Sequence, residues 1–136
     1  MLSDLMKVFS LVNNYLDPEG IFIFDFNTDY KYREIIGDTT IAENREQGSF
    51  IWENYYYEKE CINEYDLTIF EKNLDGRFDK HVETHFQKGY TPKEMEYIIA
   101  KAGMKLLEMI DADTKDKVTE TSERVFVVAR EQGKAK

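Results

Sequence analysis

YLDPEGIFIFDFN, residues 15–27, is the stretch that decides the fold. Proline disfavours helix at the residue before it and Gly20 permits a positive φ, so residues 15–20 predict a turn that ends a helix. The following residues, Ile21 to Phe26, are apolar on both faces, which is typical of a buried parallel strand in the middle of a sheet. Together the two parts predict half of an α/β unit.

The segments on either side of this stretch differ in how their apolar residues are spaced. Residues 3–16 have apolar side chains at helical spacing, so we expect an amphipathic helix there. The four that define its stripe are Leu5, Phe9, Val12 and Leu16. Residues 28–48 are polar and irregular, and we expect a connection with little regular structure, apart from a short helix that ends at Gly37-Asp38.

Three β-branched and aromatic runs follow, at residues 50–58, 62–70 and 77–90. They are separated by Lys59-Glu60 and by the sequence NLDG at residues 73–76, whose Asp75-Gly76 is a strong hairpin signal. This pattern predicts an antiparallel meander.

The last third of the chain predicts a helix and two strands. The sequence TPKE at residues 91–94 is a capping-box signature with proline in the first turn, and Gly103 is placed to end the helix in the left-handed conformation. Its buried stripe should contain Met95, Ile98, Ile99 and Ala102. Strands are predicted at residues 105–110 and 124–129, with a polar surface loop at residues 111–123 between them.

Composition narrows the class of protein. A chain of 136 residues with 42% hydrophobic residues suits a single folded domain. The net charge of -9, from 27 acidic and 18 basic residues, disfavours nucleic acid as a partner. One cysteine forms no intrachain disulfide, and the apolar runs at residues 21–24 and 125–129 are far shorter than the roughly 20 residues of a membrane span. We therefore expect a soluble, cytoplasmic protein with no membrane partner.

The order of these elements resembles the C-terminal half of class I S-adenosylmethionine-dependent methyltransferases. The residues that carry the resemblance are the turn and strand at 16–27, the E-x-H-x-Q sequence at 83–87 ahead of Tyr90, and the A-G-M sequence at 102–104. The resemblance implies an α/β fold, half of a Rossmann-like sheet with one parallel strand and a terminal reversed hairpin. Residues 1–28 and 91–130 would form this part of a single domain, and residues 49–90 an inserted antiparallel meander on the acceptor side.

The family's cofactor-binding first half has no counterpart in this sequence. None of the seven glycines stands in a G-x-G setting, and the acidic residue that holds the ribose in such folds is also missing. The resemblance therefore implies S-adenosylmethionine as cofactor of a longer parent enzyme, whose first half would precede Met1, and no cofactor for this chain alone. In-line methyl transfer to a small molecule would belong to that parent, and we expect the isolated chain to be inactive.

The alternative function is that of a non-catalytic binding or assembly module that keeps the half-fold. In either case the strand at 21–26 lacks the neighbour that a parallel sheet provides, and an unpaired apolar strand edge favours association. We expect self-association into a dimer through residues 21–26, or coverage of that edge by a rearranged segment.

The candidate substrate residues of the insertion alternate along its last predicted strand. On one face would lie His81, Glu83 and His85, which could orient an acceptor or remove its proton, and on the other the apolar Phe78, Val82, Phe86 and Tyr90, which we expect to be buried. A solvated or ion-paired sheet face explains the same alternation. A metal site at His81, Glu83 and His85 is disfavoured because neighbours at i and i+2 lie roughly 7 Å apart along a strand.

Two further groups complete the candidates. Trp52, Asn54 and Tyr56 share a strand face and could line an acceptor pocket, although aromatic side chains equally fill a core or an oligomer contact. Asp25 and Asn27 stand at the carboxyl end of the predicted parallel strand, where α/β sheets bind ligands, but they could equally cap the strand. The sequence assigns no catalytic residue and no metal ligand.

Overall fold

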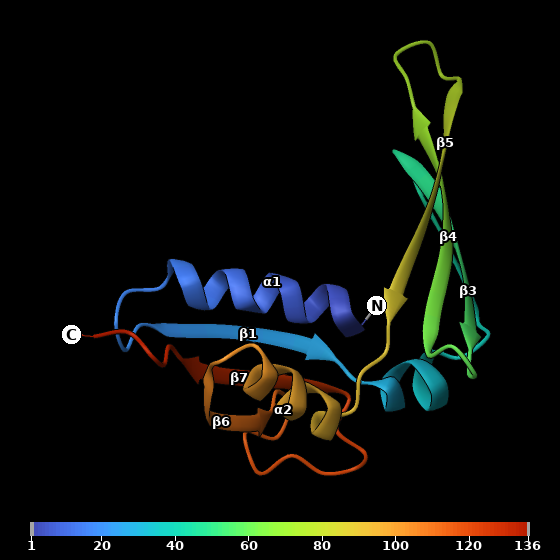
Figure 1. Cartoon of the computed structure of the whole chain (residues 1–136). Coiled ribbons are helices and arrows are strands. Elements are labelled where there is room, and N and C mark those ends of the chain that lie inside the picture. The colour runs from blue at the N-terminus through green and yellow to red at the C-terminus, as the bar shows by residue number, and fades with distance from the viewer. Residues whose placement is uncertain (1, 136) are drawn as a thin grey trace. The chain divides into compact units, whose positions relative to one another are not determined.

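The computed structural model describes residues 2–135, which form two compact units (Figure 1). Unit 1 contains the chain up to Lys31 and from Tyr90 onward, and unit 2 contains residues 32–89. Unit 1 contains α1 (Leu2–Tyr15), β1 (Ile21–Asn27), α2 (Pro92–Lys101), β6 (Lys105–Asp111) and β7 (Arg124–Arg130). Unit 2 contains β2 (Thr40–Arg45), β3 (Gly48–Tyr57), β4 (Ile62–Lys72) and β5 (Phe78–Lys88), preceded by the π-helical turn η1 (Lys31–Ile36), whose first residue belongs to unit 1. No helix in this described range is long and apolar enough to cross a membrane.

The sheet of unit 1 has the strand order β1-β7-β6, and both neighbouring pairs are antiparallel. The predicted reversed hairpin of the last two strands is therefore confirmed. The strand at 21–26 was predicted as a parallel strand without its parallel neighbour, and among the described residues its strand partner is β7, which runs antiparallel to it from Ile21↔Arg130 to Asn27↔Arg124. β1 and β6 run in the same direction, but β7 separates them.

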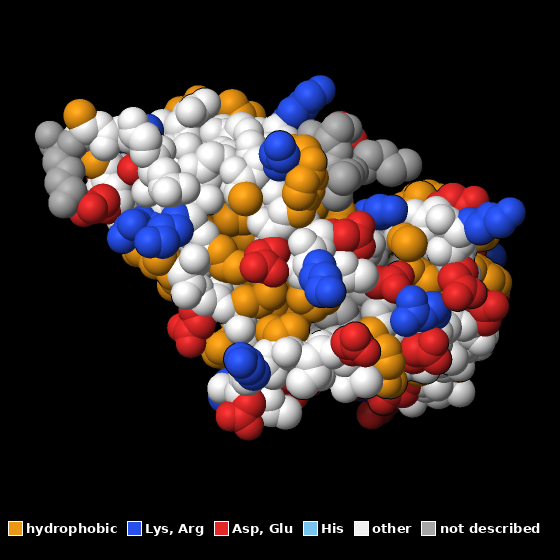
Figure 2. All heavy atoms as spheres, turned by 60° about the horizontal axis from the view of Figure 1, so that its bottom comes forward, with side chains coloured by type: hydrophobic (Ala, Val, Ile, Leu, Met, Phe, Trp, Pro, Cys, Tyr) orange, Lys and Arg blue, Asp and Glu red, His pale blue; other side chains and the backbone are white. Residues whose placement is uncertain are grey.

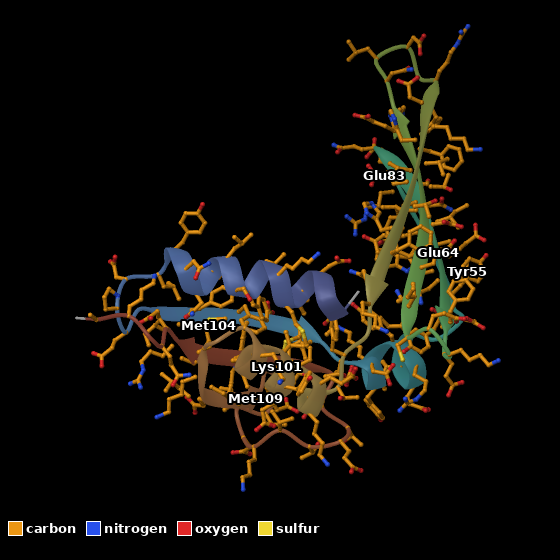
Figure 3. All side chains as sticks on the ribbon, viewed as in Figure 1. Tyr55, Glu64, Glu83, Lys101, Met104 and Met109 are labelled. Carbon is orange, nitrogen blue, oxygen red and sulfur yellow. The ribbon has the colours of Figure 1, made fainter. Side chains whose placement is uncertain are left out.

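Both helices of unit 1 cover the same face of this sheet. Phe9 of α1 packs its ring against Phe22 and Phe24 of β1, with ring centroids 5.6 and 4.9 Å apart. The buried core also takes side chains from α2, from β7 and from the short segment between α2 and β6, which contains Met104, labelled in Figure 3. These side chains are Met95, Ile98, Ile99, Ala102, Met104, Val125, Val127 and Ala129.

The other face of β1 is exposed, which corrects the expectation of burial on both faces. Ile21 is 49% exposed and Ile23 is 66% exposed. Two apolar faces are typical of an interior strand, but β1 lies at the edge of the described sheet and is covered by helix on one face only. Burial is decided by what packs on a strand, and the strand's own sequence does not carry that information.

The turn into β1 uses its glycine in a different way from the one expected. The left-handed residue is Glu19, at φ 60°, and Gly20 does not have a positive φ. Gly20 is required by close approach, since a Cβ there would lie 2.9 Å from the carbonyl oxygen of Asp17. Its amide donates to that same carbonyl, with N and O 2.7 Å apart.

The predicted ends of α2 are confirmed. The Thr91 hydroxyl accepts from the Glu94 amide at 3.1 Å, and the Glu94 carboxylate accepts from the Thr91 amide at 3.0 Å, which completes the capping box. Gly103 ends the helix at φ 90°. Met95, Ile98, Ile99 and Ala102 are all buried, as expected.

Unit 2 is a four-stranded antiparallel meander in the order β2-β3-β4-β5. Its three later strands and both hairpin turns match the prediction, and Gly76 has the positive φ of 85° that its turn requires. The short helix is present as η1, whose i to i+5 geometry is visible in the 2.7 Å bond from the Gly37 amide to the Tyr32 carbonyl. β2 was not predicted, because its sequence TIAENR is polar and exposed and its stability comes from pairing with β3.

The expected burial of one face of β5 is wrong. Phe78, Val82 and Phe86 lie on one face of this strand, as predicted, but they are 52%, 60% and 66% exposed. β5 is the edge strand of its sheet, so cross-strand contacts from β4 cover these side chains on one flank only. Tyr90 lies beyond the end of β5 and is buried in the core of unit 1.

Asp111 gives unit 1 a pH-dependent stability. Its carboxylate accepts from the amides of Asp113 at 2.8 Å and Thr114 at 3.0 Å, and the bond from Thr114 is the main reason that its pKa lies below the usual range. A lowered pKa means that the stabilisation is present above about pH 4, the unfolded pKa, and is lost as the pH falls through the folded pKa. We expect Asp111→Asn to lower the melting temperature at pH 7, and the difference from wild type to shrink at pH 3 in circular dichroism melts. A difference that grows towards pH 3 would contradict this account.

Candidate functional site

One face of the sheet of unit 2 brings together six of the predicted site residues. Pairing places Trp52 opposite Leu67 and Leu67 opposite Glu83, and one step along it places Asn54 opposite Tyr65 and Tyr65 opposite His85. Directly opposed residues project to the same side of a sheet. We call this side the aromatic face. Its members discussed below are Phe50, Trp52, Asn54, Tyr56, Asn63, Tyr65, Leu67, Ile69, Glu71, His81, Glu83 and His85.

Three stacked rings run across the aromatic face from β3 to β5. The Trp52 and Tyr65 rings have centroids 4.0 Å apart with planes inclined by 14°, and the Tyr65 and His85 rings have centroids 4.9 Å apart with planes inclined by 27°. Offset stacking of this kind fixes ring orientation and contributes roughly 0.5–1.5 kcal/mol per pair beyond burial. The stack therefore presents a pre-positioned flat surface with a titratable ring at one end.

A buried amide pair lies beside the stack. Asn54 and Asn63 are each 1% exposed, and their side chains donate to one another at 2.7 and 3.0 Å. The Asn54 amide also donates to the Gly37 carbonyl at 2.7 Å, and the Trp52 indole nitrogen lies 3.4 Å from the Asn54 side-chain oxygen. The pair thus connects β3, β4 and the turn after η1, and it orients Trp52.

The two histidines lie near carboxylates. His85 Nε2 lies 3.2 Å from a carboxylate oxygen of Glu83, and His81 Nε2 lies 3.6 Å from one of Glu71. Both pairs are exposed. Within residues 2–135, no three His, Cys, Asp or Glu side chains are arranged to hold a metal ion. The ring nitrogens of both histidines can donate or accept a hydrogen bond, so they are able to exchange a proton with a bound molecule.

A cavity of about 500 Å³ opens on unit 2 beside Trp52. Its walls come from the end of β2, the β2–β3 turn, β3 and β4, and most of its lining surface is apolar. The lining residues are Arg45, Gln47, Gly48, Ser49, Phe50, Trp52, Leu67, Ile69, Phe70 and Glu71. Cavities of this size are typical of small-molecule sites.

The opposite face of the same sheet presents tyrosine side chains that are hydrogen-bonded to glutamates. Figure 3 labels Tyr55 and Glu64 on that side and Glu83 on the aromatic face. Tyr55 donates to Glu53 at 3.1 Å and Tyr57 donates to Glu64 at 2.9 Å. Each hydrogen bond raises the pKa of its tyrosine, so both phenols remain protonated and neutral at physiological pH.

The remaining candidates, Asp25 and Asn27, belong to unit 1. Asp25 forms an ion pair with the Arg124 guanidinium, and the Asn27 side-chain oxygen accepts from the Lys31 ammonium at 3.3 Å. Thr28 beside them is buried and donates to the Ser122 carbonyl at 2.6 Å. These contacts anchor the end of β1 to β7 and its preceding loop, which is the capping role that the sequence left open.

The sequence pattern did not identify Tyr65, Leu67, Asn63 or Arg45 as site residues. Residues 62–70 were predicted as a strand. Which of its residues belong to the site depends on its register with β3. A signal was present, since the short turn between the two strands, residues 58–61 in the structure, makes Tyr57 and Ile62 an opposed pair and so fixes the register. Arg45 lies on β2, which was not predicted.

The described residues do not fit S-adenosylmethionine on their own. A nucleotide cofactor in an α/β sheet needs a glycine-rich loop between a strand and the start of a helix. In residues 2–135 the junction before η1 contains no glycine, and the junction before α2 contains Gly89 alone.

Surface charge is mixed. Figure 2 shows Lys and Arg side chains scattered singly among acidic side chains on the face that it presents, with hydrophobic side chains exposed between them. The same mixing is seen in the surface ion pairs Arg33–Glu34 and Arg45–Glu43. This surface offers little of the concentrated positive charge that drives phosphate-backbone binding.

Comparison with known proteins identifies relatives of twice the length. The chain is 33% identical over 128 residues to the "Putative methyltransferase GWCH70_2453" of Geobacillus sp. (strain WCH70), an alignment that covers 94% of the chain and 52% of the relative. It is 30% identical over 128 residues to the "Putative methyltransferase YqeM" of Bacillus subtilis (strain 168), with 94% and 51% covered. The chain therefore spans about half the length of these curated relatives. No family model matches the sequence.

Solved structures give the same result for the fold. The structure of an S-adenosylmethionine-dependent methyltransferase from Clostridium acetobutylicum matches 98% of the chain and 53% of its own length, with a TM-score of 0.87 and 23% identity. The CcbJ methyltransferase from Streptomyces caelestis matches 96% of the chain and 54% of its own length, with a TM-score of 0.76 and 13% identity. The predicted resemblance to S-adenosylmethionine-dependent methyltransferases is thus confirmed, and the chain has the α/β fold of about half of such a protein.

Proposed function

We propose that this chain supplies the acceptor-binding portion of an S-adenosylmethionine-dependent methyltransferase, and that the aromatic face is its acceptor surface. The observation that carries the proposal is the match of 94% of the chain to relatives named as methyltransferases. The cofactor would be held by the portion of those relatives that the chain does not span, because the described residues lack a cofactor loop. On its own the chain would bind an acceptor without transferring a methyl group.

The aromatic face suits a small acceptor for two physical reasons. The cavity beside Trp52 has room for one small molecule, and its apolar lining would release water from a flat or ring-shaped ligand. The stacked rings of Trp52, Tyr65 and His85 are already fixed, so binding does not have to order them. Structural neighbours named as an amino pentose methyltransferase and a sugar N-methyltransferase support a small-molecule acceptor class.

His85 is the residue best placed to exchange a proton with such an acceptor. Stacking on Tyr65 fixes its ring plane, and the Glu83 carboxylate, 3.2 Å from Nε2, helps to hold the ring in that orientation. Glu83 could itself accept a hydrogen bond from an acceptor amine or hydroxyl. In this proposal Trp52 and Tyr65 position the acceptor and His85, with Glu83, removes its proton.

A chimaera tests the proposal. The aligned 128-residue region of the Geobacillus relative is replaced by this chain, binding of S-adenosylmethionine is measured by calorimetry, and release of S-adenosylhomocysteine is measured with the small-molecule fraction of a cell extract as acceptor. We expect the chimaera to bind the cofactor and to turn over. Trp52→Ala and His85→Ala should lower turnover by about 10²-fold, within the usual range for loss of a proton-transfer or positioning group, without changing cofactor affinity.

Tyr55→Phe is the matched control, because Tyr55 lies on the opposite face of the same sheet. Its turnover should stay within a factor of two of the unsubstituted chimaera. A chimaera that binds no cofactor would overturn the methyltransferase proposal and favour the non-catalytic binding module. A chimaera that turns over equally with and without Trp52 and His85 would remove the aromatic face from the acceptor site.

A further inference from the structure

Two opposite charges lie at one end of the cavity in unit 2. Pairing places Arg45 of β2 opposite Gly48 of β3, and Gly48 opposite Glu71 of β4, so the three residues form one row across the sheet. Glu71 belongs to the aromatic face, and opposed residues project to the same side, so Arg45 projects to that side as well. No side chain fits at Gly48, because a Cβ there would lie 2.5 Å from the carbonyl oxygen of Phe70. The row therefore presents a guanidinium and a carboxylate with bare backbone between them.

Both charged side chains keep capacity to bind a further group. One nitrogen of Arg45 donates to Glu43 at 3.0 Å, and a carboxylate oxygen of Glu71 lies 3.6 Å from His81 Nε2. A guanidinium has more N–H groups, and a carboxylate more acceptor sites, than one such contact uses. The side chains of Arg45 and Glu71 are 73% and 71% exposed, so both are accessible. Their backbones lie two strand spacings apart, roughly 10 Å, which leaves room for a small group that pairs with both.

The cavity continues from this row over apolar side chains. Phe50 opposes Ile69 in the next row of the same face. Trp52 opposes Leu67 in the row after that. All four residues line the cavity, and most of its lining surface is apolar. A molecule that fills the cavity would therefore have a charged head beside Gly48 and an apolar body over these four side chains.

We propose that the cavity binds a free amino acid with an apolar side chain, whose carboxylate pairs with Arg45 and whose ammonium pairs with Glu71. A zwitterion engages both charges at once, whereas a simple amine or a simple acid engages one and leaves the other without a ligand group. The inference rests on the proposed function, because it names the class of acceptor.

The position of the charged row also indicates which end of the amino acid would receive the methyl group. Gly48 begins β3, whereas His85 shares a row with Asn54 and Tyr65, farther along the sheet. The head between Arg45 and Glu71 would therefore anchor the molecule at the end away from His85. The atom that accepts the methyl group would lie in the side chain of the amino acid, which extends towards Trp52.

Calorimetric titration of the full chain tests the inference with three probes that share one phenethyl body. L-Phenylalanine carries both charges, phenethylamine lacks the carboxylate, and 3-phenylpropanoate lacks the ammonium. We expect phenylalanine to bind about tenfold or more tightly than either analogue, because each analogue gives up one charge-assisted pair. Trp52→Ala should weaken the binding of all three probes by the same factor, since Trp52 contacts the body that they share.

Substitution of each charged residue should remove the preference for one probe group. Arg45→Gln should bind phenylalanine and phenethylamine with affinities within about a factor of two, because the carboxylate then has no partner. Glu71→Gln should in the same way bind phenylalanine and 3-phenylpropanoate equally. Arg77→Gln is the matched control, because this exposed guanidinium lies between β4 and β5, outside the cavity lining, and it should leave all three affinities unchanged.

Equal affinities for the three probes on the unsubstituted chain, or binding of none of them, overturn the inference without recourse to any variant. So does a folded Arg45→Gln variant, checked by circular dichroism, that still prefers phenylalanine to phenethylamine as strongly as the unsubstituted chain does. Selective binding of phenylalanine by a chain whose chimaera binds no S-adenosylmethionine supports the amino acid site and contradicts the proposed function. A chimaera that turns over with the cell extract, while the chain binds none of the probes, does the reverse.

Discussion

Ile98→Ala is expected to destabilise unit 1 by about 2–5 kcal/mol, the usual cost of truncating a fully buried branched side chain to alanine. Ile98 is 0% exposed and lies in a core to which α1, α2 and β7 all contribute, so the cavity left behind has walls from three elements that cannot all relax into it. A loss of this size is a large fraction of the 5–15 kcal/mol that stabilises a typical domain.

The measurement is urea unfolding followed by circular dichroism at the helical wavelength. α1 and α2 both belong to unit 1, so this signal reports mainly on that unit. Ile23→Ala is the matched control, because it removes the same atoms from a side chain that is 66% exposed in the same unit, and it should cost less than about 0.5 kcal/mol. Equal costs at the two positions would show that the buried cluster is not the stabilising core.

Unit 1 was predictable because its signals are local. The capping box at Thr91 and Glu94, the helical spacing of Met95 and Ile98, and the glycine that ends α2 each determine structure through neighbours within four residues. The pairing of β1 was less predictable, because a run such as IFIF fits an interior or an edge strand and only its partners decide which. The exposure of Ile23 follows from that same missing information.

The site was predictable in part for a related reason. Alternation along one strand gives the face of each side chain, so His81, Glu83 and His85 were correctly placed together, as were Trp52 and Asn54. The joining of these two groups into one surface depends on β4, which lies between them and contributes Tyr65 and Asn63. Neither residue type signals a site on its own, and their importance comes from what stacks or bonds across the strands.

Asn54→Leu should have an effect of similar size on unit 2, about 2–3 kcal/mol. The substitution leaves the buried side chain of Asn63 and the carbonyl of Gly37 without their partner, and an unsatisfied buried polar group costs about 1–3 kcal/mol. It also removes the acceptor near the Trp52 indole, so the ring stack with Tyr65 should loosen. Trp52 is the only tryptophan, and its fluorescence during urea unfolding reports directly on this unit.

A double-mutant cycle with Asn63→Leu separates the amide pair from general packing. If the reciprocal hydrogen bonds are the source of the cost, Asn63→Leu should destabilise the Asn54→Leu background less than it destabilises the wild type, because the unsatisfied amide is then already present. Additive costs would instead assign the effect to side-chain volume. All three variants could lose the fluorescence change while the helical circular dichroism transition is preserved. That result would mean that unit 2 cannot fold without the amide pair, because β3 and β4 then fail to pair at their buried residues.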